Sequence, residues 1–243
     1  MNIWLYLPSR FEIFTIEEIK HKLAEIKSKG FVRSLRKGPT GIGFTLETLL
    51  GIEENNISSP DLGEIELKAQ RENHKGMTTL FTFNNKAWKM KPMEAIQKYG
   101  SPDKDGRMGM YYTASPTPNS AGLFLKVDEE FLSIRSIDGS IITQWNLSDI
   151  ATKFSDKVSS VLLVKARVEL REEVEFFHFH RARLLSQGTT EVILKNAFNN
   201  GQLLVDLRLH DKGTEGARNH GTAFRIYEEN IDELYGKVQE VEF

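Results

Sequence analysis

The stretch Pro60-Asp-Leu-Gly-Glu-Ile-Glu-Leu-Lys68 contains the pattern that decides the fold. From Gly63 to Gln70, charged and apolar side chains alternate, which is typical of a strand with one face in a core. Residues two apart on a strand point to the same face, so we expect Glu66 and Lys68 to share one face. Leu67 then faces the other way, where it can anchor the strand in the core.

The charged residues of this stretch suit a hard cation. Asp61 lies at the turn that feeds the strand, where its carboxylate can approach Glu66. Two carboxylates, the backbone carbonyl of Leu67 and water would form an oxygen site suited to Mg²⁺. Lys68 would supply a fixed positive charge that orients a water or stabilises negative charge on a phosphate. Ion pairing across an exposed strand face explains the same alternation without catalysis, and that alternative stays open.

The bulk composition limits the other chemistries. The chain has 243 residues, 40% of them hydrophobic, and no cysteine, which excludes disulfides, cysteine–zinc sites and thiol catalysis. The apolar run Ile3–Leu7 is too short for a signal peptide or a membrane span, so we expect a cytoplasmic protein without a membrane role. The net charge of -2 does not suggest a nucleic-acid binder, so a DNA-binding surface would need locally concentrated basic residues.

Apolar periodicity and turn signals predict both helices and strands. The first predicted helix, 16–29, starts at a capping box of Thr15 and Glu18, and the second, 44–50, follows Thr40–Gly43 and ends at Gly51. Residues 86–99 are predicted to be helical after Pro92, and further helices are predicted at 147–158, 189–199 and 227–235. The predicted strands are 63–70, 78–83, 123–127, 131–137, 141–145, 161–170, 173–181, 203–209 and 222–226. The turn pair Asn55-Asn56 precedes the first strand, the pair Asp138-Gly139 predicts a hairpin, and residues 100–120 read as irregular.

The order of these elements predicts an α/β or α+β fold with a mixed sheet flanked by helices, rather than a regular βαβ repeat. No linker or composition shift divides the chain. We therefore expect one domain, residues 1–243, that consists of two lobes.

Two separated blocks carry further motifs. The first contains Arg36–Gly43, Glu47–Leu50, Glu53–Asn55, Pro60–Lys68 and the strand Thr79–Thr82, in that order. The second contains Val205–Arg208 and Asn219–Ile226. Pro60-Asp61 with Glu66-Leu67-Lys68 resembles the PD-(D/E)XK nuclease signature. Both blocks together resemble the MvaI/BcnI family of restriction endonucleases, relatives of the MutH mismatch-repair nickase.

The resemblance implies a PD-(D/E)XK nuclease fold with a catalytic lobe centred on residues 33–100. The family's catalytic aspartate, glutamate and lysine fall on Asp61, Glu66 and Lys68, and its helix glutamate falls on Glu47. Mg²⁺ is the implied cofactor, with Asp61, Glu66 and Leu67 as its ligands. An ordinary exposed helix residue is the alternative for Glu47.

The resemblance also implies a recognition lobe, formed mainly by residues 200–226 with middle segments. Its arginines match Arg208 and Arg225, whose fork suits the O6 and N7 atoms of guanine. Its histidine matches His220. The family run His-x-His-Gly reads Arg218-Asn-His-Gly here, so a G·C-rich target is implied but its exact sequence is not. Solvated surface side chains are the alternative for each.

The function implied by the resemblance is that of a type II restriction endonuclease acting on double-stranded DNA. It would act as a monomer that nicks the strands in turn, alongside a DNA methyltransferase. A MutH-like repair nickase controlled by a partner, a non-catalytic DNA-binding module and a nuclease-like fold without a DNA role are the alternatives.

Three further features have two interpretations each. His178 and His180 share a strand face, but without a third ligand nearby we expect surface histidines rather than a zinc site. Gly41-Ile-Gly43 precedes a helix and could approach a DNA phosphate. The basic and aromatic residues of the stretch 86–112 could contact DNA, or they could form a solvated helix face and a loop.

Overall fold

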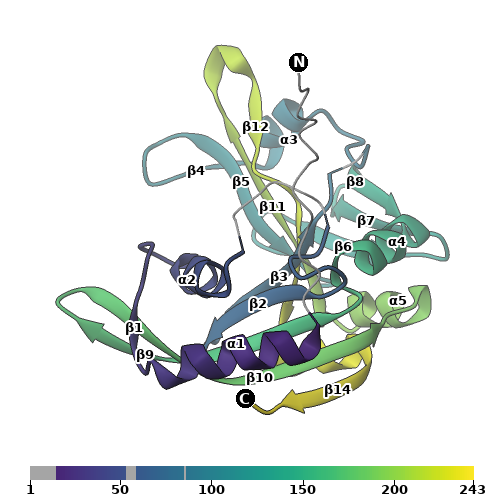
Figure 1. Cartoon of the computed structure of the whole chain (residues 1–243). Helices are drawn as coiled ribbons and strands as arrows, with labels where there is room; N and C mark the ends of the chain where they lie inside the picture. Colours follow the sequence, from purple (N-terminus) through teal and green to yellow (C-terminus); the bar gives the residue numbers. More distant parts are fainter. Residues whose placement is uncertain (1–14, 53–58, 85) are drawn as a thin grey trace, which may run out of the picture. The chain divides into compact units, whose positions relative to one another are not determined.

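The computed structural model describes residues 15–52, 59–84 and 86–243 (Figure 1). The apolar run Ile3–Leu7, the stretch Glu53–Asn55 and the turn Asn55-Asn56 lie outside the described residues. The chain divides into two compact units. Unit 1 comprises residues 1–74, 160–184 and 239–243, and unit 2 comprises residues 75–159 and 185–238.

Unit 1 contains a mixed sheet with the strand order β1-β10-β9-β2, in which β14 also pairs with β10. Strand β2 runs parallel to β9, with Glu66 opposite Val161, whereas β1 is antiparallel to β10. The strands are β1 (Val32–Arg33), β2 (Glu66–Arg71), β9 (Val161–Arg171), β10 (Val174–Gly188) and β14 (Tyr235–Val241). The division between the units falls within β10 and β14.

Two helices pack on this sheet. Helix α1 (Ile16–Ser28) begins at the predicted capping box, in which Thr15 and Glu18 exchange hydrogen bonds. Helix α2 (Gly41–Leu50) ends at Gly51, as predicted, and Gly51 adopts the left-handed conformation with φ 82°. The helix begins earlier than predicted, so Gly41 and Gly43 lie within its first turn rather than before it. Their buried side chains join those of β2, β9 and β10 in one apolar core. This core holds the start of β2 against the rest of unit 1.

Unit 2 is built around an antiparallel sheet with the order β3-β13-β11-β5-β4, in which β12 pairs with β11. The strands are β3 (Met77–Thr82), β4 (Ser101–Pro102), β5 (Met108–Ala114), β11 (Leu203–Asp211), β12 (Ala217–Asn219) and β13 (Ala223–Tyr227). A smaller antiparallel sheet contains β6 (Leu123–Val127), β7 (Phe131–Ser136) and β8 (Ile141–Asn146). The predicted Asp138-Gly139 hairpin joins β7 to β8, with Gly139 at φ 90°.

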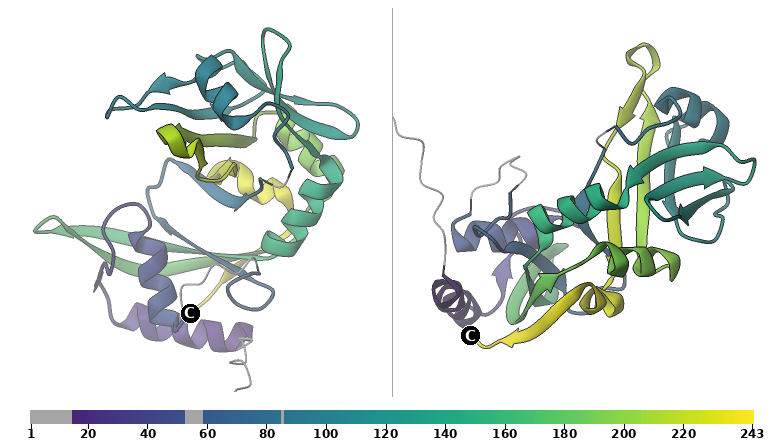
Figure 2. Two further views of the ribbon diagram at one scale, coloured as in Figure 1. Left: turned by 90° about the horizontal axis from the view of Figure 1, so that it is seen from above. Right: turned by 90° about the vertical axis from the view of Figure 1, so that its right-hand side faces the viewer.

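Aromatic side chains form much of the core of unit 2. Phe224 of β13 stacks on Phe81 of β3 at 4.9 Å between ring centroids, and the rings of Trp145 and Phe198 meet it edge-on. The helices of this unit are α3 (Pro92–Tyr99), α4 (Leu147–Val158), α5 (Glu191–Asn199) and α6 (Glu228–Ile231). Helices α4 and α5 pack against each other (Figure 2). The opposite face of β11, which lacks these apolar residues, is therefore available for polar side chains.

Besides the start of α2 and the short strands β1, β4 and β12, which were not predicted, the structure corrects the predicted elements at three places. Residues 108–114, within the segment predicted to be irregular, form β5, the neighbour of β11. The predicted helix 227–235 ends at Ile231 and, after a short 3₁₀ turn, gives way to β14. Strand β10 continues to Gly188, beyond the predicted end at Arg181. Each correction involves a segment whose conformation depends on a pairing strand distant in the sequence.

Candidate active site and DNA-recognition surface

The first residues of β2 bring the predicted catalytic side chains together. Lys68 Nζ donates a hydrogen bond to Glu66 Oε1 at 2.7 Å, which confirms that the two side chains share a face. The Glu66 side chain is 5% exposed and that of Lys68 is 20% exposed. A nearly buried carboxylate held beside an ammonium group is unlike an ordinary solvated surface pair.

A tight turn brings Asp61 to the backbone of the same strand. Leu62 and Ile65 form a bridge that folds the chain back, and Asp61 Oδ2 accepts the backbone N–H of Leu67 at 3.1 Å. The N–H of Glu66 bonds to Ser160 on the β9 side of the strand, so the N–H of Leu67 points to the opposite edge. Because the N–H and C=O of one strand residue point the same way, the carbonyl of Leu67 lies on the Asp61 side.

Glu47 comes from helix α2, which packs against β2. Its carboxylate lies over Gly43, one turn earlier, where a Cβ would be 3.7 Å from Glu47 Oε1. The loop before α2 is built closely onto the helix: Leu35 donates its N–H to Thr45 Oγ1 at 3.0 Å, and a Cβ on Gly41 would lie 2.2 Å from the carbonyl oxygen of Arg36. The close approach of the Arg36 carbonyl oxygen therefore explains why position 41 is a glycine, without a bound phosphate.

The donor set at the start of β2 consists of oxygen atoms. Two carboxylates and a backbone carbonyl suit Mg²⁺, which keeps several waters and takes only one or two protein carboxylates. Among residues 15–52, 59–84 and 86–243, no group of three or more histidine or acidic side chains could hold a metal ion. His180, one of the two strand histidines, lies with Nε2 3.1 Å from Glu72 Oε1 and is only partly exposed. The oxygen atoms at the start of β2 are the donor type that a hard cation takes.

The predicted recognition residues lie on the polar face of the sheet in unit 2. Directly opposite residues of antiparallel strands share a face, so the pairing Arg208↔Tyr111 and the pairing His210↔Arg218 place all four on one face. Arg225 belongs to this face too, because it is opposite Leu204, four residues before Arg208 on β11. The sheet therefore gathers Arg208, Arg218 and Arg225 although they are spread over three strands.

The two predicted guanine-reading arginines differ in their contacts. Arg208 donates from Nε to the carbonyl oxygen of Gly221 at 3.0 Å, and no described residue accepts a hydrogen bond from its Nη atoms. Arg225 donates from one Nη to Asp206 at 2.5 Å and from the other to the carbonyl oxygen of Met77 at 2.8 Å. The fork of Arg208 is open to a ligand, whereas that of Arg225 is held within the sheet.

A polar groove of about 810 Å³ lies on this face. It is lined by Arg107, Tyr111, Arg208, His210, Asp211, Lys212, Arg218 and His220. Desolvation of the ring and the charge of Arg218 hold the pKa of His220 below its usual value, so the imidazole is neutral at neutral pH. The groove thus combines fixed positive charge with a neutral imidazole, which can donate and accept hydrogen bonds.

His210 is the groove residue that the sequence prediction missed. It lies two residues after Arg208 on β11 and so shares its face. Tyr111 and Arg107, which belong to the predicted basic and aromatic stretch 86–112, also line the groove. Alternation along β11 was the signal that could have identified His210.

A family model of the MvaI/BcnI restriction endonucleases matches residues 20–235. The chain belongs to the MvaI/BcnI restriction endonuclease family. The solved structure of restriction endonuclease MvaI with its cognate DNA substrate is 25% identical, with a TM-score of 0.78, and the match covers 96% of this chain and 99% of that one. MvaI in the absence of DNA is 24% identical, with a TM-score of 0.53, over 98% of this chain and 100% of that one. Among curated proteins, none matches the chain.

Membership of this family confirms the predicted resemblance and the mixed α/β fold. It makes the chain a type II restriction endonuclease, a site-specific deoxyribonuclease. Within the residues that the structure describes, no helix has the length and apolar character needed to cross a membrane.

Proposed function

We propose that this endonuclease hydrolyses the phosphodiester bonds of double-stranded DNA in a Mg²⁺-dependent reaction at a short G·C-rich site. The observation that carries the proposal is the cluster at the start of β2. There Lys68 donates to the nearly buried Glu66, and Asp61 accepts the N–H of Leu67. Acidic oxygens and an ammonium group at one point are the groups that phosphodiester hydrolysis requires.

Asp61, Glu66 and the carbonyl of Leu67 are the residues that would hold the metal. They supply oxygen atoms only, which favours a hard cation over zinc or copper. When bound, Mg²⁺ would supply Lewis-acid charge to an oxygen of the scissile phosphate. Burial of Glu66 within unit 1 keeps its carboxylate fixed, so the ligand set is ordered before a metal arrives.

Lys68 would act on the attacking water and on the phosphate. Its ammonium group is held 2.7 Å from Glu66 Oε1, so it is oriented without a bound substrate. A fixed positive charge there would orient the water for in-line attack and stabilise the extra negative charge that develops on the phosphate oxygens. Glu47, on the helix that packs against β2, would act as an outer ligand or hold a neighbouring group.

The polar face of unit 2 would read the DNA. The open fork of Arg208 suits the O6 and N7 atoms of guanine, and Arg218 at the edge of the groove suits a base or a phosphate. Arg225 keeps a second hydrogen on each Nη after its contacts with Asp206 and Met77, so it would enter recognition as a rigid donor. The neutral imidazole of His220 would contact a base edge.

The chain would act as a monomer that nicks one strand and then the other. The described residues supply one cluster of the Asp61–Lys68 type per chain, which suffices for one phosphodiester bond in each encounter. A host that carries such an enzyme must protect its own sites, so we expect a companion DNA methyltransferase with the same target.

The catalytic proposal is tested by plasmid cleavage with Mg²⁺ or EDTA, using Asp61→Asn, Glu66→Gln and Lys68→Met. The matched control is Glu64→Gln, which removes an exposed carboxylate from the same turn. We expect discrete fragments that require Mg²⁺, a loss of at least about 100-fold in the three variants, and wild-type cleavage in the control. Cleavage in EDTA, or full activity in Lys68→Met, would contradict the proposal.

The recognition proposal is tested by sequencing the fragment ends and by following the open-circular plasmid over time. Arg208→Ala should abolish cutting at the specific site, while Arg135→Ala, on the small sheet of unit 2, should leave it unchanged. Transient open-circular DNA together with a monomeric mass in light scattering is the expected result. Linear product without a nicked intermediate, or a dimeric mass, would refute sequential nicking by a monomer.

A further inference from the structure

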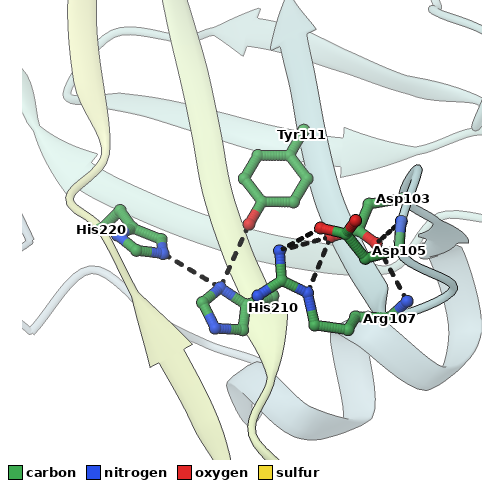
Figure 3. A network of polar contacts seen from close by, with 6 residues as sticks. All are labelled: Asp103, Asp105, Arg107, Tyr111, His210 and His220. Carbon is green, nitrogen blue, oxygen red and sulfur yellow. Dashed lines mark hydrogen bonds and ion pairs between the residues drawn. The ribbon is translucent and has the colours of Figure 1, made fainter.

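His210 is a buried polar side chain at the centre of the recognition groove. It is 6% exposed and lies on β11, between β5 and β12. A single atom, Nδ1, contacts two partners: Tyr111 Oη at 3.1 Å and His220 Nε2 at 3.0 Å (Figure 3). The centroids of the two imidazole rings are 4.9 Å apart, and the ring planes are tilted by 31°. A nitrogen shared by two partners is a hydrogen-bond junction rather than a chance contact.

The contact between the two histidines requires a single proton. Either His220 carries hydrogen on Nε2 and donates it to His210, or His210 carries hydrogen on Nδ1 and donates it to His220. Two protons at this contact would repel each other, and none would leave two acceptors facing each other. A neutral imidazole carries one hydrogen, so the state of His210 Nδ1 also determines whether His220 Nδ1 has a hydrogen.

Tyr111 and the surrounding charges support this junction. Nδ1 of His210 has one hydrogen-bonding site, so Tyr111 and His220 share it as a three-centre contact: both donate to its lone pair, or both accept its hydrogen. Asp103 binds Arg107 at 2.8 Å, and both lie in the segment between β4 and β5 (Figure 3). Arg107, Arg208 and Arg218 are among the charges that disfavour a protonated His220. The His220 ring is therefore held neutral, in a directional contact with His210.

We infer that His210 is a positioning residue for DNA recognition: it holds the ring of His220 and determines which nitrogen of His220 carries the proton. Tyr111 is the second partner that fixes His210. This inference rests on the proposed contact of His220 with DNA and adds to it a residue that does not itself touch a base. The substrate feature involved is the hydrogen-bonding atom on a base edge that faces His220 Nδ1.

The arrangement gives His220 two properties that a solvated histidine lacks. Its ring orientation is fixed before DNA binds, which reduces the entropy lost on binding. Its Nδ1 presents one hydrogen-bond role instead of a mixture of two tautomers, and no described residue hydrogen-bonds to that atom. Discrimination between bases therefore depends on a buried neighbour as well as on the exposed ring.

The test combines variants with nitrogen-15 NMR of the ring nitrogens. His210→Asn places a polar atom near the position of Nδ1, whereas His210→Leu fills the site without one. Tyr111→Phe removes only the second partner. In the DNA-free wild type at neutral pH, we expect one tautomer of His220, with distinct signals for a protonated and an unprotonated nitrogen. In His210→Leu, averaged signals of exchanging tautomers are expected.

Cleavage assays give the second readout. His210→Leu should lower the kcat/KM for the specific site about tenfold, which is the effect of one lost hydrogen bond. His210→Asn should recover most of this loss, and Tyr111→Phe should lose less than His210→Leu. Relaxed base selectivity at one position of the target is expected in the leucine variant.

The failures of the two proposals are distinguishable. If wild-type protein does not cut DNA, the proposed function fails, but the NMR measurement still tests whether His210 fixes the tautomer of His220. A wild-type spectrum with averaged His220 signals, or a leucine variant with an unchanged spectrum and unchanged site selectivity, would overturn the inference. Loss of activity in both the leucine and asparagine variants with an unchanged His220 spectrum would also overturn it.

Discussion

Replacing Arg225 with alanine should destabilise unit 2 as well as impair recognition. Arg225 on β13 donates to Asp206 on β11 and to the carbonyl of Met77 on β3, so one guanidinium connects three neighbouring strands. Its side chain is 28% exposed, and that of Asp206 is 10% exposed. The substitution leaves the Asp206 carboxylate nearly buried, where it still accepts a hydrogen bond from the hydroxyl of Thr113 at 2.7 Å.

The size of the effect follows from the burial of the pair. Removing one partner of a fully buried ion pair costs about 3–5 kcal/mol, because the other charge stays desolvated. Water reaches a quarter of Arg225, and Thr113 still donates to Asp206, so we expect about 2–3 kcal/mol for Arg225→Ala. For a protein of this size that corresponds to a fall in Tm of roughly 4–12 °C.

Calorimetry of four proteins measures the contribution of the pair: the wild type, Arg225→Ala, Asp206→Ala and the double variant. The double variant should lose less than the sum of the single variants, with a coupling of about 1–3 kcal/mol. Arg208→Ala is the matched control, since it removes one hydrogen bond worth about 1 kcal/mol. A Tm of Arg225→Ala equal to that of Arg208→Ala, or strict additivity in the cycle, would refute the reasoning.

Three further predictions concern unit 1 and pH. Gly41→Ala should destabilise unit 1 by about 1–3 kcal/mol in urea unfolding, because its Cβ would lie 2.2 Å from a backbone oxygen, whereas Gly43→Ala, with 3.7 Å to the nearest atom, should not destabilise it. Lys68→Met should remove cleavage but keep DNA affinity in gel-shift assays within about threefold, since its proposed role is at the reacting phosphate. Acidification from pH 7.5 to 5.5 should lower Tm, because burial lowers the pKa of His180 in the folded protein. Below a pH of about 6.5 the unfolded chain takes up a proton at this histidine more readily than the folded protein does, which favours unfolding. In His180→Asn the fall in Tm between the two pH values should be smaller.

Local patterns allowed most elements of the fold to be predicted. The capping box of Thr15, the left-handed Gly51 and the Asp138-Gly139 hairpin depend on interactions within a few residues, and all three are present. Strand β5 was not predicted because its glycine resembles a turn signal. A Cβ on Gly109 would lie 2.9 Å from the carbonyl oxygen of Leu209, so this glycine marks the close approach of β11 rather than a turn.

The candidate site residues divide in the same way, into those that a local pattern places and those that depend on a strand distant in the sequence. Alternation along one strand was enough to place Glu66 and Lys68 on one face, and the same rule applied to Arg208 would have identified His210. The difference between Arg208 and Arg225 could not be predicted in this way. It depends on the register of β13 against β11 and β3, which brings Asp206 and the carbonyl of Met77 to one arginine and leaves the fork of the other open. Register is a property of paired strands, so identical side chains in one sequence block acquire different roles only when the sheet forms. Under the recognition role proposed for Arg225, a loss of selectivity and a loss of stability should coincide at this residue, because the same guanidinium also joins three strands of the sheet.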